Sequence, residues 1–151
     1  MKACLAALIF FTAFSVVFAA DPKFTPSKIT YAKKNTWEAV ASRWMSSNEL
    51  KNYVEDQKKD NKQMIFVDYN GAQYRGLFSE KIKFKGWFYV EVFSEKSMAG
   101  EIAYYKKRGM EPTYIYKNAG GYTAIFTNPE QVGDARKLLE ELGIGACTVK
   151  E

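Results

Sequence analysis

Residues 87–149 read WFYVEVFSEKSMAGEIAYYKKRGMEPTYIYKNAGGYTAIFTNPEQVGDARKLLEELGIGACTV, and the succession of patterns in this stretch decides the fold. Its first residues belong to a run, Lys81–Phe93, that alternates and is rich in aromatic and β-branched residues. This run predicts a strand with a bend at Gly86. Ser94 is the predicted N-cap of a helix, and Gly109 ends that helix as a left-handed residue. Two β-rich runs follow the helix: Thr113–Tyr116 and Tyr122–Phe126.

The clearest helix signal of the chain comes next. Asn128 is the predicted N-cap, Pro129 stands at the first helical position, and Gln131 would complete a capping box with Asn128. Five apolar residues form one stripe at helical spacing: Val132, Ala135, Leu138, Leu139 and Leu142. Gly143 ends the helix, and a short strand over Ala146–Val149 closes the stretch. The order βαββαβ predicts an α+β fold with a ferredoxin-like sandwich in the C-terminal half.

The preceding part of the chain follows the same order of elements. A shift of 48 residues aligns two segments without a gap and brings apolar residues together: Leu50 with Met98, Val54 with Ile102, and Val67 with Ile115. The first unit has Ser46 or Ser47 as helix cap, and then the runs Met64–Tyr69 and Tyr74–Phe78 joined through the hairpin signal Asn70-Gly71. Such matches arise from an internal repeat, or by chance between any two helix–strand–strand units. A further short helix is predicted over Trp37–Trp44.

The first residues are typical of an export signal. Met1-Lys2 is a short basic start, an apolar run follows, and small residues precede the expected cleavage after Ala19. An uncleaved membrane anchor is the alternative, but the apolar run falls short of the roughly 20 residues of a spanning helix. We therefore expect a signal peptide over residues 1–19 and a secreted or periplasmic protein without a membrane span after cleavage. A linker or extended arm is expected over 20–36, a helix–hairpin unit over 37–86, and the ferredoxin-like domain over 87–151.

The composition excludes several kinds of catalytic site. The 151 residues include no histidine and only two cysteines, Cys4 and Cys147. Catalytic triads and dyads that need histidine, histidine-containing zinc sites and four-cysteine metal sites are therefore excluded. Carboxylate pairs such as Glu55-Asp56 are adjacent on helices and diverge. We expect no enzyme, no cofactor and no metal. Cys147, alone after signal removal, is expected as a small buried hydrophobe or as a free thiol for intermolecular pairing.

The chain is moderately basic. It has 22 Lys+Arg against 17 Asp+Glu, a net charge of +5 that falls to +4 when Lys2 leaves with the signal. This charge suits an anionic surface such as a cell wall, an outer leaflet or nucleic acid, without choosing among them. Three alternating lysines share one predicted strand face: Lys81, Lys83 and Lys85. They would meet an anionic polymer or protect a solvated edge strand.

From Trp87 onward the chain resembles the SPOR (sporulation-related repeat) domain, a bacterial module that binds peptidoglycan. The matching stretches are residues 89–92 before the serine-capped helix, KKRGMEPTYIY over 106–116, Gly121-Tyr122, and NPEQVGDARKLLEELGIGACTV over 128–149. The chain has Glu91 where the family usually has Gln, and it lacks the family's Gly-Ser-Phe or Gly-Pro-Phe turns. The resemblance covers residues 87–150 and implies a cell-envelope protein that binds cell-wall glycan.

The residues of a glycan-binding face can be assigned by alternation, because both helices of a ferredoxin-like domain cover one face of its sheet. The open face is then predicted to carry Trp87, Tyr89, Glu91, Tyr114, Tyr116 and Thr123. Aromatic rings suit the apolar faces of sugars, and tyrosine hydroxyls can bond to sugar hydroxyls. The same chemistry would stack bases, but export argues against nucleic acid as a partner. Noncatalytic binding of peptidoglycan through this aromatic face is the leading hypothesis.

A second hypothesis gives the aromatic face an internal role. The unit at 37–80 would cover the face and form an ordinary second core. The chain would then be a protein-interaction or inhibitor module, built from two helix–hairpin repeats that share one sheet, and its partner would be another envelope protein. The exposure of Tyr114 and Tyr116 separates the two hypotheses.

Overall fold

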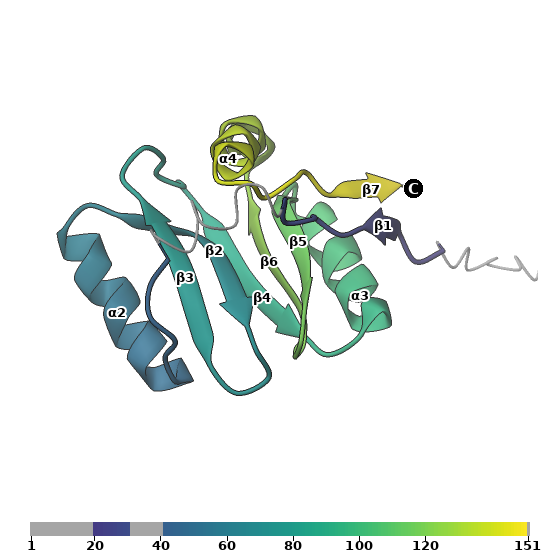
Figure 1. Cartoon of the computed structure of the whole chain (residues 1–151). Helices are drawn as coiled ribbons and strands as arrows, with labels where there is room; N and C mark the ends of the chain where they lie inside the picture. Colours follow the sequence, from purple (N-terminus) through teal and green to yellow (C-terminus); the bar gives the residue numbers. More distant parts are fainter. Residues whose placement is uncertain (1–19, 31–40, 151) are drawn as a thin grey trace, which may run out of the picture.

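The structure, a computed structural model, describes residues 20–30 and 41–150 and shows an α+β protein (Figure 1). The elements in chain order are β1 (Lys23–Thr25), α2 (Ser47–Lys59), β2 (Gln63–Tyr69), β3 (Tyr74–Ser79), β4 (Trp87–Val92), α3 (Glu95–Lys106), β5 (Glu111–Asn118), β6 (Gly121–Thr127), α4 (Pro129–Glu141) and β7 (Thr148–Lys150). The predicted signal peptide lies outside the described residues. So do the first four residues of the predicted helix at Trp37–Trp44, and the remaining four, 41–44, are not helical.

The predicted local signals for turns and caps are largely confirmed. Ser46 is the N-cap of α2 in a complete capping box with Glu49, and Ser94 caps α3. Gly109 ends α3 with a φ of 71°, a left-handed conformation that only glycine adopts without strain. Gly71 has a φ of 96° in the turn between β2 and β3.

Two antiparallel sheets form the centre of the molecule. β2 pairs with β3 in the first sheet, and the second sheet has the order β4-β6-β5. The short segment 42–45 lies along the outer edge of β3, where the Ser42 N–H donates to the Gly76 carbonyl at 2.9 Å and Met45 bridges to Tyr74. The first sheet therefore has a third, irregular edge segment.

The two sheets and their helices repeat one arrangement. Moved by 48 residues, the first residues of α2 and β2 coincide with those of α3 and β5, and the first residue of β3 falls on the second of β6. The pair Ser42 and Gly76 falls on Val90 and Ala124, which are partners in β4 and β6. The structural correspondence therefore extends over a βαββ unit and includes the edge strand that precedes each helix.

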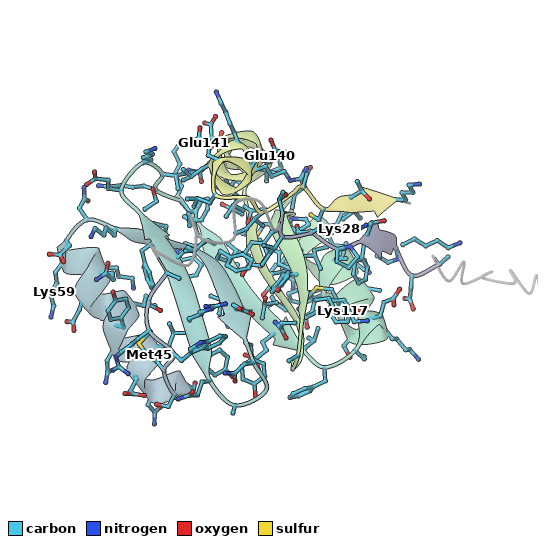
Figure 2. All side chains as sticks on the ribbon, in the orientation of Figure 1. Lys28, Met45, Lys59, Lys117, Glu140 and Glu141 are labelled. Atoms are coloured by element: carbon cyan, nitrogen blue, oxygen red, sulfur yellow. The ribbon has the colours of Figure 1, made fainter. Side chains whose placement is uncertain are left out.

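Each helix covers the outer face of its own sheet, and the two inner faces meet. Figure 1 shows α2 and α3 on opposite sides of the molecule, with the strands between them and α4 across one end. Figure 2 shows Met45 beside α2, where it packs with Leu50 and Val67. On the other side a cluster joins α3 to its sheet: Val90, Met98, Ile102, Ile115, Ala124 and Phe126. The alternation of β4, β5 and β6 correctly predicted that the strand residues of this cluster face the helix.

The central cluster between the sheets contains residues of both predicted units. Phe66 and Leu77 of the first sheet pack with Tyr114 and Ile125 of the second. Ile82 and Phe84 join them from the segment between β3 and β4. The two units thus share one core.

The predicted ferredoxin-like order is not confirmed. Its second helix would lie beside α3, but α4 directs Ala135 and Leu139 into the central cluster. Its fourth strand would join the sheet of β4, but β7 pairs with β1, Phe24 opposite Val149. The physical reason is that the first sheet makes a second apolar core on the other face, and the apolar stripe of α4 is buried there.

Two local predictions are wrong: the strand before β4 and the capping box at the start of α4. Residues 81–86 are not a strand, and Asn128, although it is the N-cap, makes no side-chain capping bond. The Gln131 amide instead donates to the Lys83 carbonyl at 2.6 Å and accepts from the Lys85 N–H at 2.9 Å. Gln131 therefore satisfies the backbone of an extended segment that has no strand partner, and it is not available for a capping box.

Candidate functional site

The predicted aromatic face faces the first sheet and is not open. Tyr114 and Thr123 have exposed fractions of 0%. The other four predicted residues are half-buried: Trp87, Tyr89, Glu91 and Tyr116. The Phe66 ring of β2 lies 4.7 Å from the Tyr114 ring and 5.3 Å from the Tyr116 ring, centroid to centroid. Alternation therefore assigned these residues to a common face, but the expectation of an open platform is wrong because β2 and β3 cover it.

Two hydroxyls of this face bind the free edge of β2. The Val67 N–H donates to Tyr114 Oη at 3.0 Å, and Thr123 Oγ1 donates to the Val67 carbonyl at 2.8 Å. Val67 is fully buried, so its backbone groups need partners inside the protein. Tyr114 and Thr123 supply them and thereby replace a neighbouring strand.

The carboxylate of the face is also occupied. Glu91 accepts one hydrogen bond from Tyr74 Oη and one from Tyr89 Oη, each at 3.0 Å. Burial, aided by the negative charge of Glu91, raises the pKa of both tyrosine hydroxyls. Both therefore remain neutral donors at neutral pH. The bond from Tyr74 links β3 to β4, whereas the bond from Tyr89 lies within β4. The six predicted site residues are brought together, but they form an interface within the chain.

A group of aromatic side chains on the opposite face of β4 remains exposed. Phe88 of β4 is 51% exposed and Tyr104 of α3 is 48% exposed. Both contact the Tyr105 ring, at centroid distances of 5.3 Å and 5.1 Å, and Tyr105 stacks on buried Phe126. We call Phe88, Tyr104 and Tyr105 the aromatic strip. Phe93, directly after β4, is 81% exposed.

Sequence reasoning missed the aromatic strip. Phe88 shares its parity along β4 with Val90, which packs under α3, so alternation places Phe88 on the helix-covered face. Tyr104 offered a signal, because it falls outside the apolar stripe of α3 formed by Met98 and Ile102. The Arg108 guanidinium lies 3.4 Å from the centre of the Tyr104 ring, and this cation–π contact orients the ring on the surface.

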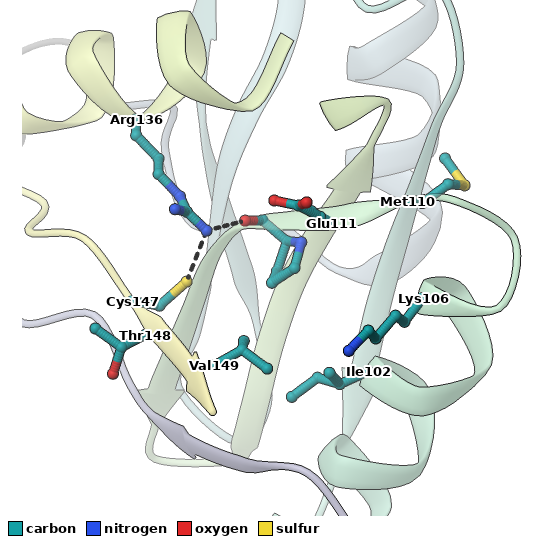
Figure 3. A pocket seen from close by; sticks show the side chains of 9 residues that line it. Ile102, Lys106, Met110, Glu111, Arg136, Cys147, Thr148 and Val149 are labelled. Carbon is teal, nitrogen blue, oxygen red and sulfur yellow. Dashed lines mark hydrogen bonds between the residues drawn. The ribbon is translucent and has the colours of Figure 1, made fainter. Parts of the chain in front are cut away.

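A pocket of about 460 Å³ is the second candidate site. It lies between α3, the start of β5, α4 and the C-terminal segment, as Figure 3 shows. Its lining is Ile102, Lys106, Met110, Glu111, Pro112, Arg136, Cys147, Thr148 and Val149. Cys147 is a free thiol, 2% exposed, in the apolar cluster under α3. This environment agrees with the expectation of a small buried hydrophobe.

Within the described ranges 20–30 and 41–150, no group of three or more His, Cys, Asp or Glu side chains could hold a metal ion. None of the helices there has the length and apolarity to cross a membrane. No protein-family model, curated protein or solved structure matches the chain. The geometry of the candidate sites alone therefore carries the functional proposal.

Proposed function

We propose that the chain is a noncatalytic binding protein of the cell envelope that recognises a partner protein through the outer edge of β4 and the aromatic strip beside it. The supporting observation is the contrast between β4 and the other sheet edges. The edge of β3 is covered by the segment 42–45, and the Ser27 N–H donates to the Ile115 carbonyl at 2.6 Å on the edge of β5. The edge of β2 is satisfied at Val67 by two side-chain hydroxyls.

The outer edge of β4 has no comparable cover within the described part of the chain. β4 is the terminal strand of its sheet, and its only backbone ladder there is with β6. An edge strand presents alternate N–H and C=O groups to a further strand. Phe88 stands on this strand with about half of its surface in water, and its ring contacts Tyr105, which in turn contacts Tyr104. Exposed aromatic residues beside an unpaired edge are typical of protein interfaces.

The partner that fits this surface is a protein with an extended segment that carries alternating apolar side chains. Its backbone would pair with β4, and its apolar residues would cover the aromatic strip, as in strand addition. The export signal expected at residues 1–19 puts this encounter in the envelope or outside the cell. Binding of cell-wall glycan through the predicted face has less support, because Tyr114, Thr123 and Glu91 are bound to the first sheet.

Selection of displayed random peptides on residues 20–151 tests this proposal. We expect the enriched peptides to be extended and to alternate apolar residues, because they must follow β4. Binding should slow amide exchange in β4. The double variant Phe88→Asp, Tyr104→Asp should weaken peptide binding by roughly tenfold or more through loss of apolar contact. The matched control is Lys51→Asp with Asn52→Asp on α2, both exposed, and it should bind as the wild type does.

Two results would contradict the proposal. The first is retention of the wild type and of the Phe88→Asp, Tyr104→Asp variant on purified peptidoglycan sacculi, with no peptide enriched; this would restore the glycan hypothesis. The second is a dimer in sedimentation analysis that the same variant converts to a monomer. The occupant of β4 would then be a second copy of the chain.

A further inference from the structure

The pocket beside α3 contains a cation whose charge no carboxylate of residues 20–30 and 41–150 balances. Arg136 projects from α4 into the pocket, as Figure 3 shows. Its Nη2 donates to the Pro112 carbonyl at 2.8 Å and lies 3.8 Å from Cys147 Sγ. Its Nε is buried without a hydrogen-bond partner. A guanidinium carries five N–H donors, and these contacts use only one nitrogen.

No carboxylate of the described chain forms an ion pair with Arg136. Glu111 belongs to the lining, but it is exposed and is not paired with the guanidinium. A half-buried cation without an anion loses hydration and gains little in return. An anion supplied from outside would therefore be favoured at this position.

The neighbouring thiol does not supply that anion. Burial raises the pKa of the Cys147 thiol, and the adjacent Arg136 guanidinium only partly opposes this effect. A thiol with a raised pKa remains protonated at neutral pH. Cys147 therefore contributes a small apolar surface next to the guanidinium and leaves its charge unbalanced.

The lining of the pocket combines apolar residues with polar ones. Its walls include Ile102 and Met110 on one side and Pro112 and Val149 on the other. A second basic residue, Lys106, lies on the α3 side. A volume of about 460 Å³ falls within the range of small-molecule sites. Apolar walls with a few convergent polar groups are typical of such sites, the polar groups fixing the orientation of the ligand.

We propose that this pocket binds a small organic acid, with its carboxylate on Arg136 and its apolar chain between Ile102, Met110 and Val149. The planar guanidinium matches a carboxylate with two parallel hydrogen bonds. The Nη1 nitrogen, which makes no hydrogen bond within the described residues and is not buried, supplies one of these donors. The site is independent of β4, so it adds a ligand to the proposed protein-binding function.

Titration with octanoate, followed by amide NMR of the isotope-labelled protein, tests the proposal. The matched neutral probe is octanamide, which has the same chain and no charge. We expect octanoate to shift amides of residues 102–111 and 147–149 and to bind roughly tenfold or more tightly than octanamide, because a charge-assisted pair is lost with the neutral probe.

Variants at the pocket test the role of the Arg136 charge separately from the role of the apolar space. Arg136→Gln should remove the preference for octanoate over octanamide. Val149→Trp, a change at a half-buried residue whose side chain points into the pocket (Figure 3), should fill the pocket and weaken both probes while Arg136 remains. Arg108→Gln is the control, because it removes one positive charge outside the pocket. Equal affinity for the two probes, shifts outside the pocket, or an octanoate affinity that Arg136→Gln and Val149→Trp leave unchanged would each overturn the proposal.

Discussion

At the scale of single residues, Val67 links the two sheets through both of its backbone groups. Its N–H binds Tyr114 Oη and its C=O binds Thr123 Oγ1. These three residues have exposed fractions of 0%. A buried backbone group without a partner costs more than the bond itself contributes. The hydroxyls of Tyr114 and Thr123 therefore have a structural role, and a ligand would have to displace β2 to reach them.

Tyr114→Phe tests this role. It leaves the Val67 N–H buried without a partner, so the free energy of unfolding should fall by about 1–3 kcal/mol in urea titrations. Thr123→Val, which leaves the Val67 carbonyl unpaired, should have a similar effect. Tyr53→Phe is the control, because the Tyr53 hydroxyl of α2 forms no hydrogen bond within the described residues, and it should change stability by less than about 0.5 kcal/mol. An unchanged free energy of unfolding for Tyr114→Phe would show that water reaches the Val67 N–H.

At the scale of elements, α2 and α4 begin in different ways although both carry a capping-box pattern. In α2, Ser46 Oγ accepts from the Glu49 N–H at 3.3 Å, and Glu49 accepts from the Ser46 N–H at 2.8 Å. In α4 the corresponding glutamine binds the segment 83–85. The local pattern is thus followed where no tertiary partner competes for the side chain, and it fails where one does.

The capping box of α2 predicts an acid-dependent loss of stability. Hydrogen bonds from the Ser46 N–H and hydroxyl, with a further bond from Arg43, lower the pKa of Glu49 from 4.5 to about 2. Because the folded state favours the ionised carboxylate, its contribution is present above the ordinary pKa and is lost as the pH falls from 4.5 toward 2. The difference in urea midpoint between the wild type and Glu49→Gln should therefore shrink over this range.

Glu80→Gln is the control for the pH experiment. Glu80 is exposed after β3 and makes no hydrogen bond within the described residues. Its substitution should leave the urea midpoint close to the wild-type value at each pH. A midpoint difference for Glu49→Gln that does not change with pH would contradict the role assigned to this carboxylate.

At the scale of the whole molecule, two βαββ units pack their inner faces together. Phe66 and Tyr114 occupy equivalent positions, 48 residues apart, and their rings lie 4.7 Å from each other. Leu77 and Ile125 are also equivalent and join the same cluster. Equivalent residues in mutual contact indicate a pseudo-twofold relation between the units, like that of a symmetric dimer. Neither unit buries its inner face without the other.

A fragment of residues 87–150, nearly the whole of the ferredoxin-like domain predicted over 87–151, should therefore not fold alone. Removal of residues 20–86 exposes the sheet face that carries Tyr114 and Ile125. It also removes the residues of the central cluster that the first unit contributes and against which α4 packs. We expect poor dispersion in amide NMR and binding of a hydrophobic dye, whereas residues 20–150 should give a dispersed spectrum. A well-dispersed spectrum of the fragment would show that the C-terminal half is an independent domain.

The sequence by itself determined the features that depend on neighbours in the chain. Helix caps at Ser46 and Ser94, the left-handed Gly109 and the turn at Gly71 follow from local backbone chemistry. The alternation along β4 and β6 determined which residues share a face, because successive side chains of a strand point to opposite sides.

Only the tertiary structure decided which face of the second sheet is covered. A tyrosine such as Tyr114 has the same pattern in sequence whether it meets a glycan, solvent or a second sheet, and its actual neighbour, Phe66, is 48 residues away. The same holds for the pairing of β7 with β1 and for the pocket, whose lining comes from residues 102–149. Alternation shows which side chains of a strand share one face of the sheet. Whether that face is buried depends on which distant apolar surface removes it from water.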